Sequence, residues 1–152
     1  MSNKSNTKKK KQEKSNNEFI KNIANLQKTI NKKDIESFAK IDYPIFCFKH
    51  LQMKSIQNCS DPKYFLDYLS RLKKLSELGW EEIRKSDRHS FGMEKISKES
   101  IKPDIPNFVT PEATLLAFRA NGNNLPFVGV QCGKIFHVIF MESKFGDIYD
   151  HV

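Results

Sequence analysis

The sequence predicts an α+β protein in which a small antiparallel sheet packs against helices, with an added N-terminal helical segment. Three observations support this class. Short apolar runs separated by Asn-Gly and Cys-Gly-Lys turns occupy residues 113–142, as in a sheet built from hairpins. Apolar residues at three- and four-residue spacing indicate helices before these runs. An aromatic-rich run at residues 43–51 predicts one further strand.

The first 40 residues differ in composition from the rest of the chain. Residues 1–17 are mostly Lys, Asn and Ser, and we expect this tail to be disordered because it has little apolar surface to bury. Residues 18–40 carry apolar side chains at helical spacing, and Asp34 is placed to cap a second short helix there. Residues 41–152 then form the predicted α+β domain.

The first half of this domain is expected to contain one strand and one long helix. Pro44 suits the first position or the edge of the strand. Asp61 followed by Pro62 predicts a helix start, since Asp caps a helix and Pro fits its first turn. Gly79 is expected to end this helix. The face predicted to be buried consists of Phe65, Tyr68, Leu69, Leu72 and Leu75.

The second half of the domain is expected to supply most of the sheet. Residues 80–85 predict one or two further helical turns, and Gly92 predicts a bend before a proline-containing loop at 97–111. The last apolar run is nearly continuous except for His137, so we expect that strand to lie inside the sheet, covered on both faces. The three predicted strands are about residues 113–120, 125–131 and 134–142.

The net charge of +8 is concentrated at one end of the chain. Residues 1–40 contain eleven lysines and four acidic residues, a net charge of +7, whereas residues 41–152 carry only +1. A lysine-rich tail attracts phosphate backbones, membrane surfaces or acidic proteins without specificity, or it keeps the protein soluble. An anion site in the domain would therefore depend on local clustering of basic side chains.

Several classes of protein are not favoured by the sequence. No apolar run is long enough to span a membrane, and the basic N-terminus lacks the apolar core of a signal peptide, so we expect a cytoplasmic protein that does not bind membranes. We expect no cofactor, because no nucleotide-binding or hydrolase motif is present. The three cysteines lack CxxC spacing and the histidines lack ligand spacing, so no disulfide framework or metal site is expected.

Two sets of basic residues are suited to phosphate chemistry. Arg88 and His89 lie in a cation-rich stretch before a glycine bend, where they can bind phosphate and transfer a proton, or simply form a solvated helix end. Arg119 ends a predicted strand. Its guanidinium can pair with a phosphate, or with a carboxylate such as Glu112 or Glu142.

Three further side chains are candidates for proton transfer. His137 is either a core histidine or, if it faces a cleft, a general acid or base. Tyr149 and His151 lie near the end of the chain and can complete a site if this segment packs back along the sheet. Glu94 is available as a carboxylate partner for any of these groups.

The predicted order strand, helix, helix, strand, strand, strand across residues 43–142 resembles the RelE/YoeB-like toxin superfamily. The late sequence is similar too, with an arginine at a strand end (FRANG), two more strands and a terminal aromatic-histidine segment (IYDH). The segment RHSFGMEKI precedes these strands, where such toxins also carry basic residues and a loop. The resemblance covers roughly two thirds of the chain.

The resemblance implies a small cytoplasmic ribonuclease of a toxin–antitoxin module, which cleaves mRNA, often on the ribosome, without a metal. This chemistry needs a base for the 2′-hydroxyl, a cation for the charged phosphorane and an acid for the leaving oxygen. The implied partners are an antitoxin protein and mRNA or the ribosome. The residues assigned to catalysis are Arg119, Tyr149, His151 and His89. The residues assigned to substrate binding are Arg88 and His137.

The chain also departs from these toxins. The domain lacks their strong positive charge, and the predicted strand Leu125–Gln131 contains no Arg or Lys. One alternative is therefore a non-catalytic interaction module, such as a phage or mobile-element accessory protein, that binds a partner through the Phe19–Ile30 helix and the lysine-rich tail. Another is sequence-independent nucleic-acid binding by the tail alone. Convergence of the predicted site residues on one concave face would favour the ribonuclease.

Overall fold

The structure is a computed structural model that divides the chain into two compact units, Met1–Ile41 and Asp42–Val152. It describes residues 6–11, 13–14, 30–40, 42–119 and 125–151.

The N-terminal unit contains helix α2 (Lys32–Lys40). Asn31 Oδ1 accepts a hydrogen bond from the Asp34 N–H at 3.0 Å, so the residue before the helix is the cap and Asp34 lies in its first turn. The predicted Phe19–Ile30 helix lies almost entirely outside the described residues. Residues 6–11 have a helical backbone, and their side chains are exposed. Such a short helix buries no apolar surface that could stabilise it. The disorder expected for residues 1–17 therefore stays a prediction.

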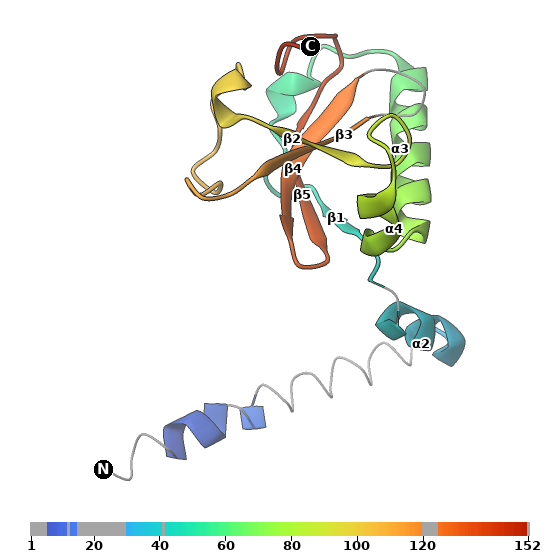
Figure 1. Cartoon of the computed structure of the whole chain (residues 1–152), viewed down its shortest axis with the longest axis vertical. Coiled ribbons are helices and arrows are strands. Elements are labelled where there is room, and N and C mark those ends of the chain that lie inside the picture. The colour runs from blue at the N-terminus through green and yellow to red at the C-terminus, as the bar shows by residue number, and fades with distance from the viewer. Residues whose placement is uncertain (1–5, 12, 15–29, 41, 120–124, 152) are drawn as a thin grey trace. The chain divides into compact units, whose positions relative to one another are not determined.

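The C-terminal unit is built on a five-stranded sheet with the order β1-β5-β4-β3-β2 (Figure 1). Its strands are β1 (Ile45–Cys47), β2 (Met93–Ile96), β3 (Leu115–Arg119), β4 (Pro126–Cys132) and β5 (Ile135–Met141). The predicted α+β class is confirmed. The sheet is mixed and not purely antiparallel, because the edge strand β1 pairs parallel with β5 while the other neighbours pair antiparallel.

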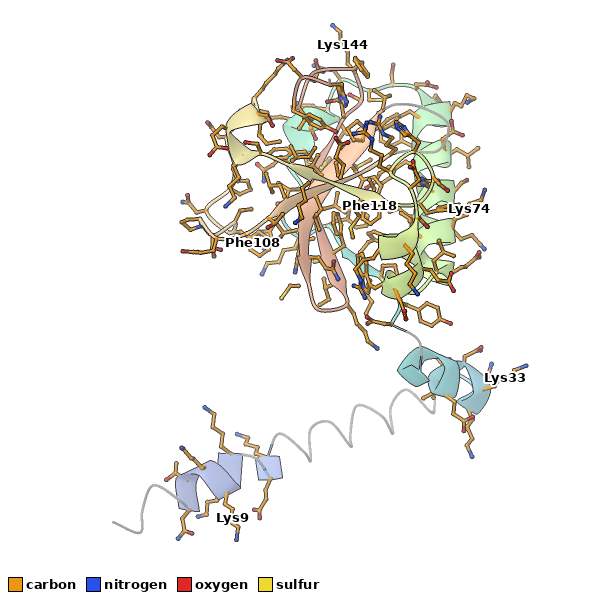
Figure 2. The ribbon with its side chains drawn as sticks, in the orientation of Figure 1. Lys9, Lys33, Lys74, Phe108, Phe118 and Lys144 are labelled. Carbon is orange, nitrogen blue, oxygen red and sulfur yellow. The ribbon has the colours of Figure 1, made fainter. Side chains whose placement is uncertain are left out.

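Helices cover one face of this sheet. Between β1 and β2 the chain forms the short 3₁₀ turn η1 (Met53–Ser55) and the helices α3 (Pro62–Glu77) and α4 (Trp80–Lys85). Asp61 Oδ1 accepts a hydrogen bond from the Lys63 N–H at 3.0 Å, which confirms the predicted start of α3. In Figure 2 the ring of Phe118 lies inside the unit, whereas Lys74 on α3 points away from the sheet.

The buried face of α3 differs from the predicted one. Tyr64 and Arg71 are buried, whereas Phe65 and Leu69 are exposed; the other three predicted members of the face are buried. The Tyr64 hydroxyl donates a hydrogen bond to the Glu142 carbonyl at 2.8 Å, which holds this side of the helix against the sheet. Apolar periodicity alone did not distinguish the two neighbouring faces.

Two local features around β2 were not predicted correctly. Gly79 has a φ of −79° and precedes α4, so it does not end α3 in the left-handed conformation of a glycine cap. The edge strand β2 was missed because it is short and carries two charged residues. The chain turns at residues 88–91, directly before the predicted position, and the Gly92 N–H closes this turn by donating to the Asp87 carbonyl at 2.9 Å. A Cβ atom at Gly92 would lie 2.2 Å from the Ser86 carbonyl oxygen.

Irregular segments, and not helices, cover the opposite face of the sheet. Apolar side chains from the loop at 97–113, which contains the 3₁₀ turn η2 (Lys98–Ser100), and from the segment 143–151 pack there. The inner strand β5 contributes buried side chains to both faces, as predicted. No helix in the described part of the chain is long and apolar enough to cross a membrane.

Candidate functional site

The pairing of β2 with β3 brings Glu94 and Arg119 to the same face of the sheet. Glu94 lies opposite Ala117, and side chains alternate along a strand, so Ala117, Arg119 and Glu94 share this face. The Arg119 Nη2 atom lies 3.7 Å from Glu94 Oε2. Arg119 therefore pairs with Glu94, and not with Glu112 or Glu142, because the unpredicted strand β2 lies next to β3.

Glu94 also connects the basic turn before β2 to this position. Arg88 Nη1 donates a hydrogen bond to Glu94 Oε1 at 3.0 Å, and Arg88 Nε donates to His89 Nε2 at 3.3 Å. One carboxylate is thus shared by two guanidinium groups, Arg88 and Arg119. The cluster keeps an excess of one positive charge, although the domain as a whole is nearly neutral.

The C-terminal segment is attached to the sheet by Glu142, which follows β5 and is fully buried. Its Oε1 accepts a hydrogen bond from the Gly146 N–H at 3.0 Å, and its Oε2 accepts from the Ile148 N–H at 3.1 Å. His151 Nε2 lies 2.5 Å from Glu142 Oε1. These contacts fold residues 143–151 back along the sheet, the arrangement that a functional role for Tyr149 and His151 requires.

These segments together form a pocket of about 230 Å³. Glu94, Arg119, Tyr149 and His151 all line it, and the hydroxyl-bearing Ser97 does so as well. Three of the four residues assigned to catalysis from the sequence therefore share one concave surface. The fourth, His89, connects to this surface through its contact with Arg88.

Tyr149 is largely buried beside this pocket. Burial, together with the nearby carboxylates of Glu94 and Glu142, raises the pKa of its hydroxyl to about 12, and Arg119 offsets part of this effect. The hydroxyl therefore keeps its proton at neutral pH and can act as a hydrogen-bond or proton donor. Its ring centroid lies 4.4 Å from that of His151.

The His151 ring is held on two sides. It stacks on Phe145, with ring centroids 4.2 Å apart, and its Nε2 atom contacts Glu142. Among the described residues no partner hydrogen-bonds to the other ring nitrogen, Nδ1. A carboxylate that orients an imidazole and leaves its second nitrogen available is an arrangement suited to proton transfer.

His137 does not line this pocket. His137 pairs with Val130 on β4, whereas Arg119 pairs with Pro126 on the same strand. Val130 and Pro126 are four residues apart, which corresponds to about 13 Å along the strand. Its ring packs edge-on against Phe108 with ring centroids 5.0 Å apart. Burial, and secondarily His50, lowers the pKa of His137. His137 is half-buried in this packing, but its Nδ1 atom is buried without a hydrogen-bond partner, so it is not a fully satisfied core histidine. The pocket gives no support to its assignment to substrate binding.

Sequence reasoning missed the importance of Glu142, which it considered only as a partner for Arg119. A charged residue directly after a long apolar strand is the signal that could have identified it. Sequence reasoning also missed a second pocket of about 640 Å³, whose lining includes Gln52, Lys54 and Asp147 but no predicted site residue. Within the described ranges, no three His, Cys, Asp or Glu side chains are grouped to hold a metal ion.

No protein-family model, no curated protein and no solved structure matches the chain. What the fold and the pocket define is an α+β domain in which an arginine, a tyrosine and a carboxylate-bound histidine share one small concave site.

Proposed function

We propose that the protein is a metal-independent endoribonuclease of the RelE-like toxin type that cleaves mRNA. The main support is the shared pocket of Arg119, Tyr149 and His151, which come from a strand end and from the separate C-terminal segment. Their side chains are the types that cleavage of an RNA phosphodiester by its own 2′-hydroxyl requires. A cytoplasmic location and an antitoxin partner are parts of the same proposal.

Each side chain has a distinct role in the proposed reaction. His151, oriented by Glu142, removes the proton from the 2′-hydroxyl, and the resulting oxygen attacks the adjacent phosphorus. Arg119 stabilises the charge on the phosphorane, and Tyr149 donates a proton to the departing 5′-oxygen. The products are an RNA with a 2′,3′-cyclic phosphate and an RNA with a free 5′-hydroxyl.

The environment of Arg119 supports its role as an anion ligand. Its Nε atom is buried without a hydrogen-bond partner, and its contact with Glu94 is long at 3.7 Å. Glu94 is at the same time engaged at 3.0 Å by Arg88. The buried Nε atom is out of reach of a ligand, but the terminal nitrogens donate no hydrogen bond to a described residue, and a phosphate in the pocket would use this capacity.

Cleavage of mRNA by purified protein, free and on ribosomes, tests the proposal. We expect Arg119→Met to lower the cleavage rate by about 100-fold or more, because an electrostatic contact to the transition state is lost. Arg84→Met is a matched control, since Arg84 is exposed on α4, away from the pocket. Absence of cleavage by the wild-type protein in both settings, or equal activity of the two variants, would contradict the proposal.

A further inference from the structure

Arg71 on α3 is a buried cation without a carboxylate partner. It is 6% exposed, its Nε atom has no hydrogen-bond partner, and no described residue forms an ion pair with it. Buried charges in proteins are normally paired, because an unpaired charge loses its hydration without compensation. Burial lowers the pKa of Arg71 accordingly. No contact with a described residue compensates its charge, so packing within the domain does not explain this arginine.

The contact that Arg71 does make orients its guanidinium group. Its Cζ atom lies 4.4 Å from the centroid of the Phe91 ring, a cation–π arrangement. Of the three guanidinium nitrogens, Nε alone is fully buried without a hydrogen-bond partner. The two terminal nitrogens also bond to no described residue, so they are the nitrogens that reach solvent. The Phe91 ring therefore orients the guanidinium group, and its terminal nitrogens keep a small exposed surface at which an anion can bind.

Arg71 lies at the same end of the β2–β3 pair as Arg119, one of the residues that line the pocket. Phe91 precedes Met93, which pairs with Phe118, the neighbour of Arg119. Figure 1 shows the turn before β2 passing beside α3, in agreement with the contact between Arg71 and Phe91. Phe91 packs with the helical core, so Arg71 approaches this end of the sheet from the α3 face and Arg119 from the opposite face.

We propose that Arg71 binds a backbone phosphate of the RNA strand outside the catalytic pocket, and so holds the strand across the edge of the sheet at β2. This inference rests on the proposed ribonuclease function and names a second contact for its substrate. A guanidinium fork matches the geometry of phosphate oxygens, and the phosphate supplies the counter-charge that no described residue provides for Arg71. Phe91 is a positioning residue that keeps the fork oriented.

RNA binding measured over a range of salt concentrations tests the proposal. The probe is a single-stranded oligonucleotide with every 2′-hydroxyl methylated, which cannot be cleaved through a 2′-oxygen. We expect Arg71→Met to weaken binding about tenfold and to reduce the slope of log affinity against log salt by about 0.7, the value for one lost phosphate contact. Arg71→Lys keeps the charge and should retain most of the slope with reduced affinity.

Lys74→Met is the matched control, since it removes one positive charge from an exposed position one turn along α3. Thermal unfolding should show that Arg71→Met folds, because methionine retains the apolar stem and leaves no buried charge. Equal salt slopes for Arg71→Met and Lys74→Met would overturn the inference. In that case Arg71 has only a packing role against Phe91.

A measurement with inorganic phosphate separates this inference from the proposed function. Phosphate should raise the unfolding temperature of the wild type and Lys74→Met more than that of Arg71→Met, relative to chloride at equal ionic strength. If the protein neither cleaves nor binds RNA but this difference is present, the function is wrong and the phosphate site remains. If RNA is cleaved but the difference and the change in slope are both absent, the function remains and the site is wrong.

Discussion

Glu142 shows how one buried side chain organises the candidate site. Its carboxylate accepts hydrogen bonds from two backbone amides of the C-terminal segment and contacts His151. Its backbone carbonyl accepts the hydroxyl of Tyr64, so the same residue also links α3 to the sheet. A buried carboxylate needs several donors to offset its lost hydration, and these donors define the path of the last nine described residues.

The raised pKa of Tyr149 predicts a loss of stability at alkaline pH. The unfolded chain loses the tyrosine proton near pH 10, whereas the folded protein holds it to about 12. The stabilisation is therefore fully present below about pH 10 and is lost as the pH rises toward 12. In urea unfolding, Tyr149→Phe should lose less stability over this range than the wild type.

The loss should be reduced and not abolished in Tyr149→Phe, because burial also raises the pKa of Tyr64 and Tyr68 above the ordinary value. Absorbance of ionised tyrosine provides an independent measurement on the folded protein. If the variant and the wild type lose equal stability between about pH 10 and 12, the tyrosine at position 149 is not the protected group.

At the level of elements, the β4–β5 hairpin depends on a close backbone approach. A bulge near Gly129 places Ile139 and Phe140 on the same face of the sheet, where both are buried. A Cβ atom on Gly129 would lie 2.0 Å from the carbonyl oxygen of His137 on the neighbouring strand. The φ of Gly129 is not positive, so its backbone conformation would accept other residues. The close contact with His137 is therefore what requires a glycine here.

We expect Gly129→Ala to destabilise the domain by roughly 3 kcal/mol or more, because two paired backbones would have to separate. Gly133→Ala provides the comparison. Its Cβ atom would meet open space, but its φ of +60° costs only about 1–2 kcal/mol for a residue with a side chain. Urea unfolding of both variants measures the difference. A smaller effect at position 129 than at 133 would contradict this account of the hairpin.

The elements differ in how well the sequence predicted them. Asp61 and Pro62 identified the start of α3, because capping is a local interaction. The buried face of the same helix was predicted only in part, since Tyr64 replaces Phe65 on it through a hydrogen bond to the distant Glu142 carbonyl. The strand β2 was missed because it is short, its two central residues are charged, and its place in the sheet is fixed by pairing with β3.

On the scale of the whole molecule, charge and chemistry lie in different units. The first unit carries nearly all of the net charge, and the candidate site lies within Asp42–Val152. The interaction-module alternative assigns function to the first unit, whereas the ribonuclease proposal assigns it to the second. Their separation in the chain makes the two proposals distinguishable by truncation.

A protein consisting of residues 42–152 should fold and cleave mRNA, because the pocket and the apolar side chains buried on both faces of the sheet lie within these residues. Its RNA affinity should depend less steeply on salt than that of the full chain, since the lysine-rich tail is removed. Circular dichroism, the cleavage assay and RNA binding over a range of salt concentrations measure these three outcomes. If this fragment folds but does not cleave RNA while the full chain does, catalysis requires the first unit. If it folds but no longer binds a protein that the full chain binds, the interaction module is favoured.

The sequence by itself determined the α+β class, the start of α3, the buried strand β5 and the charge difference between the units. These features depend on local patterns, namely side-chain periodicity, capping and composition. Only the tertiary structure decided that Glu94 joins Arg88 to Arg119, that Glu142 holds His151, that His137 lies elsewhere and that Arg71 is buried. The physical reason is that these contacts join residues through strand pairing and helix packing, which single-chain periodicity does not encode.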